Sequence, residues 1–349
     1  MKQVLKIKIV FLLIAFFVEG AQAQDCKALW QQAIKETSPM GKIAYFGMYI
    51  DANCKDSLAE AHVYVAEALI NNGQGILAES DLDKAIALKP TLAKAYFYKG
   101  LIEKDPQISS KYYDKAIVAA AGDFNAGIVY NNHGVEKLKL QDYKGAILDF
   151  DKAIELNPKD AMAYDNRGSA KARLRYYKGA IQDYNKAIEL DPYNAEAYMD
   201  RGLTKNDLQD YKGAIQDYSK AIELNPYNAQ AYNNRGFIKN DLQDYKGAIQ
   251  DFDKAIKLNP NKAIYYLSRS NAKSSLLDHK GALHDLDKAI ELNPNKAEAY
   301  NNRGTIKSNL GDYKAAIQDF DKALELNPNL RSASDNRNFA KNQLKAIKK

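Results

Sequence analysis

The sequence predicts an all-α solenoid of stacked antiparallel helix pairs, with about eight repeats and a cap at each end. The first observation behind this prediction is a recurring string, Asp-Tyr-Lys-Gly or a close variant of it. It begins at Asp142, Tyr176, Asp210, Asp244, Asp278 and Asp312. The second observation is a set of prolines in the same step: Pro90, Pro158, Pro192, Pro226, Pro260, Pro294 and Pro328. A period of 34 residues is typical of units that cannot bury their apolar faces alone and therefore stack.

Each repeat has its aromatic and small residues at fixed positions. The fourth position is aromatic at Tyr164, Tyr198, Tyr232, Tyr266 and Tyr300. The eighth is glycine at Gly134, Gly168, Gly202, Gly236 and Gly304, with Ser270 as the exception. The twenty-fourth is aromatic at Phe150, Tyr184, Tyr218, Phe252 and Phe320, with Leu286 as the exception. Alanine stands at positions 20 and 27, so each half of a repeat carries one apolar helical face.

This pattern resembles the tetratricopeptide repeat family. Six regular repeats cover residues 127–330, and two less regular ones cover 59–126. The resemblance implies a right-handed superhelix whose concave groove is lined by the first helices. It also implies a scaffold that binds a peptide or a partner domain, and not an enzyme.

The two ends depart from the repeat. Residues 24–58 fit no repeat, and we expect them to form a helical N-terminal cap. Residues 331–349 read as a basic C-terminal capping helix, with six cationic side chains against Asp335 alone. Without this tail and the first 23 residues the chain is about neutral, which argues against a nucleic-acid footprint.

The first 23 residues predict a signal peptide. Three lysines precede the apolar run 9–18, and Ala21-Gln22-Ala23 matches a cleavage site with small residues. The sequence thus predicts export to the periplasm or the medium, with Gln24 as the mature N-terminus. No second apolar stretch of this kind follows, so no integral membrane span is expected.

The chain has two cysteines, Cys26 and Cys54. In an exported protein an even pair predicts a disulfide, and two independent buried thiols are the alternative. The two cysteines and four scattered histidines do not form a zinc motif. We therefore expect no metal and no cofactor.

Motifs of catalysis are missing from the sequence: there is no P-loop and no Gly-x-Ser-x-Gly. Acidic residues such as Asp149 and Asp151 recur with the repeat, which indicates a scaffold role, and no catalytic residue is predicted. Two functions remain open. One is a scaffold that holds a protein or peptide ligand, and the other is an architectural subunit of an envelope or secretion assembly.

The expected ligand site lies where the repeats differ from one another. In the resembled family, first-helix positions 2, 5, 9, 12 and 13 face the groove. Here these positions carry the apolar residues Met199, Leu203, Phe237, Ile264 and Leu267, and the amides Asn206, Asn233, Asn240 and Asn271. With Glu196, Asp207 and Asp241 nearby, they predict a peptide with one or two apolar anchors and a neighbouring Lys or Arg. Neutral drift at exposed positions is the alternative.

Charged residues interrupt the apolar pattern at positions 7 and 23. Arginine stands at position 7 of five repeats, from Arg167 to Arg303, and aspartate at position 23 of six, from Asp149 to Asp319. Pairing within one repeat fails upstream, because Val65 would face Asp81 and Lys99 would face Tyr112. The sequence therefore predicts ion pairs between adjacent repeats, from Asp81–Lys99 through Asp149–Arg167 to Asp285–Arg303.

Overall fold

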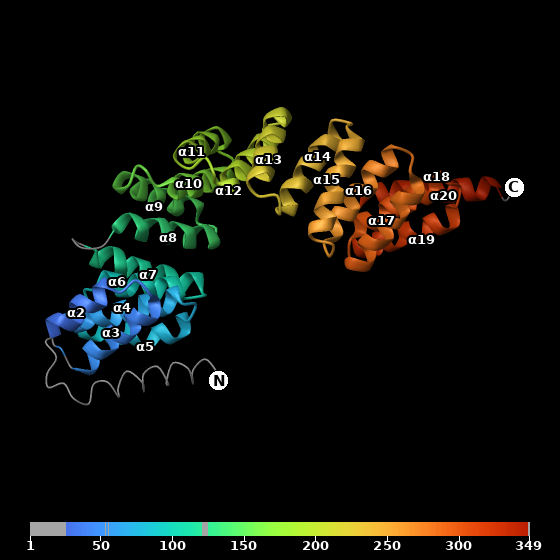
Figure 1. Ribbon diagram of the computed structural model, residues 1–349. Helices are drawn as coiled ribbons and strands as arrows, with labels where there is room; N and C mark the ends of the chain where they lie inside the picture. Colours follow the sequence, from blue (N-terminus) through green and yellow to red (C-terminus); the bar gives the residue numbers. More distant parts are fainter. Residues whose placement is uncertain (1–25, 53, 55, 121–124, 348–349) are drawn as a thin grey trace. The chain divides into compact units, whose positions relative to one another are not determined.

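The computed structural model of the protein describes residues 26–52, 54, 56–120 and 125–347 (Figure 1). The predicted signal peptide lies outside these residues. The described part is all-helical and contains no strand. None of its helices is long and apolar enough to cross a membrane.

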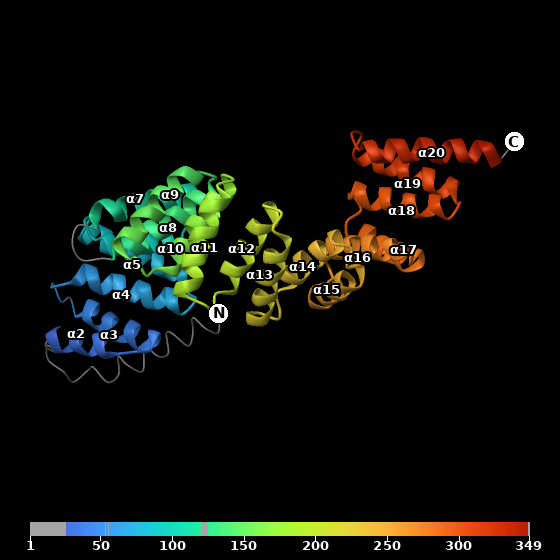
Figure 2. The same cartoon turned by 90° about the horizontal axis from the view of Figure 1, so that it is seen from above.

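Helix pairs follow one another along the chain (Figures 1 and 2). The cap is α2 (Cys26–Lys35) and α3 (Pro39–Asp51), and the last helix is α20 (Arg331–Ile347). The eight repeats between them are α4 (Leu58–Asn71) with α5 (Gly75–Leu88), α6 (Ala93–Ile102) with α7 (Pro106–Ala119), α8 (Ala126–Lys139) with α9 (Tyr143–Leu156), α10 (Ala161–Arg173) with α11 (Tyr177–Leu190), α12 (Ala195–Asp207) with α13 (Tyr211–Leu224), α14 (Ala229–Asp241) with α15 (Tyr245–Leu258), α16 (Ala263–Ser275) with α17 (His279–Leu292), and α18 (Ala297–Asn309) with α19 (Tyr313–Leu326). The chain forms two compact units, one ending at Leu190 and the other beginning at Asp191.

The recurring Asp-Tyr-Lys-Gly string marks the turn inside a repeat. Gln141 adopts a left-handed conformation (φ 62°) and, with Asp142, donates backbone hydrogen bonds to the last turn of α8. Asp142 then caps α9, because its carboxylate accepts the N–H of Gly145 at 2.9 Å. The same left-handed position recurs at Arg175, Gln209, Gln243, Leu277 and Gly311. The end of one helix and the start of the next are therefore encoded within four residues.

Close packing between the two helices of a repeat depends on the glycine at position 8. A Cβ atom placed on Gly236 would lie 2.9 Å from the ring of Phe252, which is buried. The repeat that departs from the pattern has Ser270 at position 8 and Leu286 at position 24, and both are buried. Buried alanines at positions 20 and 27 complete the interior of the six regular repeats.

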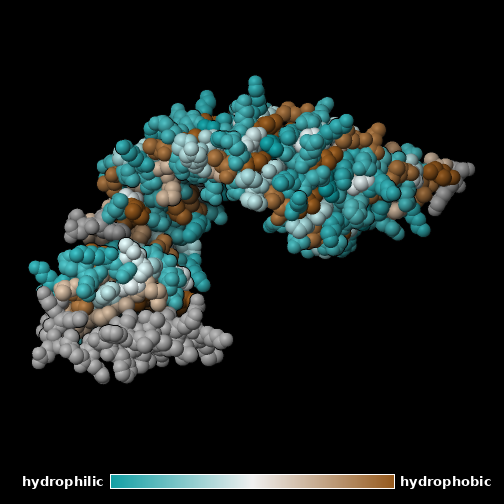
Figure 3. All heavy atoms as spheres, viewed as in Figure 1, coloured by the Kyte–Doolittle hydropathy of each residue, from teal (hydrophilic) through white to brown (hydrophobic). Residues whose placement is uncertain are grey.

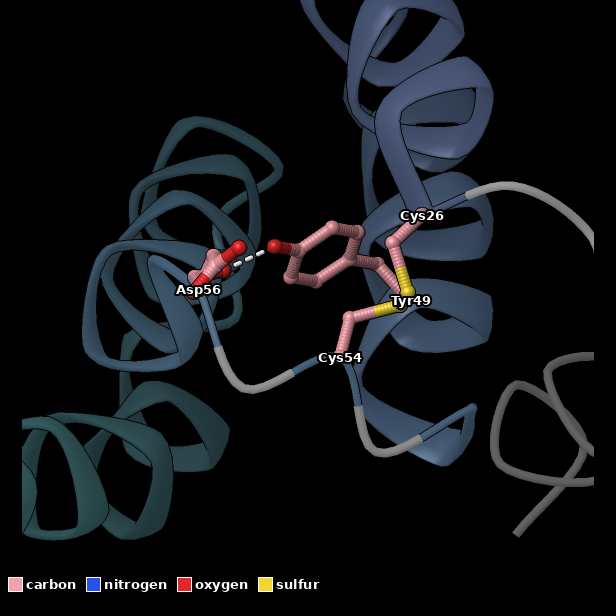
Figure 4. Close-up of a disulfide and its surroundings, with 4 residues drawn as sticks. All are labelled: Cys26, Tyr49, Cys54 and Asp56. Atoms are coloured by element: carbon pink, nitrogen blue, oxygen red, sulfur yellow. Dashed lines mark hydrogen bonds between the residues drawn. A yellow bond between two sulfur atoms is a disulfide. The ribbon is translucent and has the colours of Figure 1, made fainter.

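The N-terminal cap packs on the first repeat through aromatic rings. Trp30 lies edge-on to Phe46 at 5.4 Å and to Tyr64 of α4 at 5.8 Å. A disulfide joins Cys26, at the start of α2, to Cys54, after α3 (Figure 4). The hydroxyl of the buried Tyr49 donates to the backbone carbonyl of Asp56, as Figure 4 also shows.

The arginine at position 7 binds the aspartate at position 23 of its own repeat. Arg235 donates through Nε and Nη2 to the two carboxylate oxygens of Asp251, at 3.0 and 2.6 Å. The same two-pronged pair recurs as Arg167–Asp183, Arg201–Asp217, Arg269–Asp285 and Arg303–Asp319. Lys239 also binds Asp251, at 2.7 Å. The predicted pairing of these aspartates with the next repeat is therefore wrong.

A different acid links adjacent repeats. Nη1 of Arg303 binds Asp287, at position 25 of the preceding repeat, at 2.7 Å. The equivalent contacts are Arg167–Asp151, Arg269–Asp253 and Arg337–Asp321, while Arg235 meets the hydroxyl of Ser219. The hydrogen bonds to Asp319, outweighing the opposing effect of burial, raise the pKa of Arg303 above its ordinary value.

The upstream repeats keep parts of this arrangement with other residues. Asp81 pairs within its repeat, with His62 at 2.7 Å, and not with Lys99 as predicted. Lys99 keeps only the contact with the preceding repeat, to Asp83 at 2.6 Å, and its ammonium lies 5.5 Å from the ring of Tyr112. Because these repeats lack the usual arginine or aspartate, their sequence does not show that the pairs form within a repeat.

Candidate functional site

One stripe along α14 combines an exposed aromatic ring with two amide side chains. Asn233, Phe237 and Asn240 are spaced by four and three residues, so they share a helical face. Phe237 is 51% exposed, whereas Asn233 is 7% exposed. The side-chain oxygens of Asn233 and Asn240 are buried, and neither has a hydrogen-bond partner within the described part of the chain. The stripe therefore offers an apolar anchor point beside two acceptors that lack donors.

Two further residues of the predicted site have exposed apolar side chains on the neighbouring first helices. Leu203 on α12 is 41% exposed, and Ile264 on α16 is 45% exposed. Hydrophilic and apolar residues are interspersed over the visible face of each unit (Figure 3). Asn206 is half-buried on α12.

Met199 and Leu267 lie in the interior and not on the groove surface where the sequence placed them. They are 8% and 7% exposed, and each belongs to a hydrophobic core cluster of the second unit. Both occupy position 5 of a first helix, and Asn233 at the same position is equally buried. Position 5 is therefore a packing position in these three repeats.

Where position 5 is an asparagine, consecutive first helices can make a polar contact there. In the first unit, Asn166 at position 6 of α10 donates to Asn131 at position 5 of α8, at 3.1 Å. The corresponding donor for Asn233 would be Ser268 on α16, which is itself buried. The serine side chain is shorter than asparagine and carries no amide, so the oxygen of Asn233 is left without this donor.

Between α16 and α18 other residues make the polar contact. Leu267 at position 5 of α16 has no acceptor, and Asn302 of α18 instead donates to Asn271 at 2.9 Å. Asn271 is exposed, and this hydrogen bond already occupies its side-chain oxygen. Sequence reasoning missed the orphaned oxygen of Asn233, although Ser268 in place of an asparagine was a readable signal.

Free charge near the stripe is negative. Glu196, Asp207 and Asp241 are exposed on α12 and α14. The lysines of the same helices are engaged elsewhere, because Lys205 and Lys239 bind second-helix aspartates at 2.8 and 2.7 Å. This arrangement favours a ligand with a cationic group next to an apolar one.

The first unit brings Ser110, His133 and Asp149 into a chain that the sequence did not suggest. Nε2 of His133 lies 2.8 Å from the hydroxyl of Ser110, and Nδ1 lies 3.1 Å from Asp149. Lys137 also binds Asp149, at 2.8 Å. His133 is 3% exposed, so a substrate has no access to the imidazole. The histidine takes the place of the arginine at position 7 and links two repeats.

No group of three His, Cys, Asp or Glu side chains suited to a metal ion is found among the residues that the structure describes.

Comparison with known proteins supports the architecture. Family models described as tetratricopeptide repeat match residues 229–262, 297–330 and 128–160, and one described as TPR repeat matches 176–205 and 202–240. The mitochondrial import receptor subunit TOM70 of Homo sapiens is 30% identical over 128 residues, which cover 33% of this chain and 21% of the relative. The relative from Mus musculus has the same identity over 20% of its length. The chain thus spans about a fifth of the curated relatives it matches.

Two solved structures have the same fold. One is pilF of Pseudomonas aeruginosa, with a TM-score of 0.54 and 19% identity over 60% of this chain and 95% of that chain. The other is the APC/C heterotetramer Cut9–Hcn1, with a TM-score of 0.53 and 15% identity over 90% of this chain and 66% of that chain. These two likenesses concern the fold alone. The 34-residue period, the stacked helix pairs and the matching family models identify the chain as a tetratricopeptide repeat protein.

Proposed function

We propose that the protein is an exported, non-enzymatic scaffold that binds an extended peptide segment of a partner along the first-helix face of its second unit. Phe237 anchors an apolar side chain of the ligand, and the buried side chains of Asn233 and Asn240 turn outward on binding so that their oxygens accept N–H groups. The exposed acids, Asp207 and Asp241, favour a lysine or arginine beside the anchor.

The orphaned oxygens on both sides of Phe237 are the observation that carries this proposal. A buried acceptor without a donor costs about 1–3 kcal/mol, and a ligand that supplies the donor recovers much of this. Backbone N–H groups of an extended chain are donors that recur along every peptide. An exposed aromatic beside such acceptors has the character of an interface hot spot. The similarity to an import receptor subunit also supports a role in binding proteins.

Replacing Phe237 with alanine is expected to weaken peptide binding by about 2 kcal/mol or more, because hot-spot aromatics bury most of their area in the partner. The probe is a fluorescent dodecapeptide selected on the purified protein from a random library, with affinity measured by anisotropy. The melting temperature should change little, since half of the ring is already exposed.

Tyr227→Ala is the matched control for this variant. Tyr227 is 82% exposed in the loop before α14, so its loss should leave both affinity and stability unchanged. Asn233→Leu removes the acceptor and should also weaken the peptide. If Phe237→Ala keeps its affinity while its melting temperature falls, the ring belongs to the core and the groove assignment is wrong.

Export has its own test, an intact-mass measurement of the protein recovered from producing cells. The expected mass is that of a chain starting at Gln24, with or without cyclisation of that residue. Alkylation of the unfolded, unreduced protein should add nothing, because the structure bonds Cys26 to Cys54. A retained Met1 would contradict export, and two alkylated thiols would contradict the disulfide.

A further inference from the structure

Helix α20 docks on the last repeat as a first helix would. Asn336, at position 6, donates to Asn301 at 3.4 Å and to Thr305 at 3.2 Å. Arg337, at position 7, binds Asp321 of the preceding repeat through Nη1 at 2.9 Å. First helices elsewhere in the chain make the same two kinds of contact, one to the preceding first helix and one to the preceding second helix. Helix α20 therefore occupies the place of a ninth first helix.

The other edge of the Arg337 guanidinium has no partner within the described residues. In five repeats, Nε and Nη2 of the position-7 arginine hold the aspartate of the second helix, as in Arg303–Asp319. Nε of Arg337 is buried and makes no hydrogen bond. The side chain is 29% exposed, against 20% or less for the paired arginines. One edge of the Arg337 guanidinium is therefore bound to Asp321, and Nε on the other edge has no hydrogen bond.

Helix α20 also carries the second cation that binds the aspartate in the regular repeats. In the regular repeats the lysine four residues after the arginine shares the aspartate. These pairs are Lys171–Asp183, Lys205–Asp217, Lys239–Asp251, Lys273–Asp285 and Lys307–Asp319, at 2.7–2.8 Å. On α20 this position is Lys341, which is exposed, and Lys345 follows one turn later. The face therefore keeps both cations that hold a carboxylate in the repeats.

The residues that admit a closely packed second helix are changed on α20. Asn338 stands at the position of the glycine, where in the preceding repeat a Cβ atom would lie 2.8 Å from the ring of Phe320. Ser334 stands at the position of the tyrosine. The Nε edge of the Arg337 guanidinium therefore suits a carboxylate on a segment that does not bring an aromatic ring against α20.

We propose that Arg337 and Lys341 form a receptor for an aspartate or glutamate side chain of a partner protein, on an acidic segment that lies along α20. Charge complementarity selects this occupant, since Arg331, Lys345 and the two receptor residues are cationic and Asp335 is the one acid of the helix. The site is separate from the groove around Phe237. It holds its ligand through the same two-pronged geometry that the repeats use internally.

The test uses the full mature protein and a fluorescein-labelled helical peptide with the sequence of residues 312–329. The peptide carries Phe320→Ala, so that no ring meets Asn338. We expect saturable binding in fluorescence anisotropy, and a loss of about tenfold in affinity when Arg337 is replaced by glutamine, because a bidentate charged contact is removed. A twin peptide with Asp319→Asn should lose a similar factor, and combining it with Arg337→Gln should add little.

Arg331→Gln is the matched control, because it removes an exposed charge at the start of the same helix. It should change affinity less than twofold. Hydrogen exchange of the α20 amides shows whether the helix still packs on the last repeat in the Arg337→Gln variant. If it does not, Lys341→Gln tests the carboxylate site instead, because Lys341 is exposed. Equal losses for Arg331→Gln and Arg337→Gln would overturn the proposal. So would binding to vesicles of phosphatidylserine without binding to the peptide, since the face would then recognise an anionic membrane.

Discussion

Replacing Asp251 with alanine is expected to lower the free energy of unfolding of the second unit by about 3 kcal/mol or more. The carboxylate is buried and binds both Arg235 and Lys239. Its loss therefore leaves a partly buried cation without its counter-charge. Among the described residues Arg235 binds no second carboxylate, because its contact in the preceding repeat is the hydroxyl of Ser219. Urea unfolding measures the loss, and hydrogen exchange should place it in α14 and α15.

A double-mutant cycle separates this pair from the alternative that the sequence favoured. Arg235→Ala combined with Asp251→Ala should cost about 1–3 kcal/mol less than the sum of the two single changes. Arg235→Ala combined with Asp217→Ala is the control and should be additive, since Asp217 binds Arg201 and Lys205. Strong coupling in the control cycle and none in the first would restore the pairing between repeats.

Ser219→Asp offers a rescue of the Asp251 variant. Four other position-7 arginines bind an aspartate at the equivalent place, for example Asp287 beside Arg303. The new carboxylate should therefore recover part of the stability lost with Asp251. No recovery would mean that the lysine, and not the arginine, determines the cost.

The ion pairs show what a repeating sequence leaves undetermined. An arginine and an aspartate that both recur every 34 residues are compatible with pairing inside a repeat or across the boundary. Only the crossing of the two helices decides which carboxylate lies within reach. The irregular repeats were used to choose, but there His62 and Tyr112 have replaced the usual partners, and the choice came out wrong.

The exposure of three residues of the candidate site was predictable from the sequence. Phe237, Leu203 and Ile264 are exposed, as their positions in the repeat indicated. Position 5 was misjudged because its burial depends on the next first helix, which covers Met199 and Leu267 in this chain. The fold itself was predictable because glycine, alanine, proline and the capping aspartate recur in one register, and each has a local physical role.

The glycine at position 8 carries the second large expected effect. Gly236→Ser should destabilise the second unit by about 3 kcal/mol, because the new Cβ would lie 2.9 Å from Phe252 and 3.2 Å from a backbone oxygen of α15. The ring is buried and cannot move away without opening the helix pair. Urea unfolding of the purified variant gives the loss.

The chain itself indicates the compensating change. Its one repeat with serine at position 8 has leucine at position 24, and the hydroxyl of that Ser270 is satisfied by the carbonyl of Leu267 at 2.7 Å. Phe252→Leu should therefore restore part of the stability of Gly236→Ser, with a coupling of about 1 kcal/mol or more. In the reverse direction, Leu286→Phe alone should lower the stability of its repeat, and adding Ser270→Gly should restore part of that stability. If the costs are additive in both repeats, the ring and the Cβ atom do not compete for the same space, and the glycine is required for another reason.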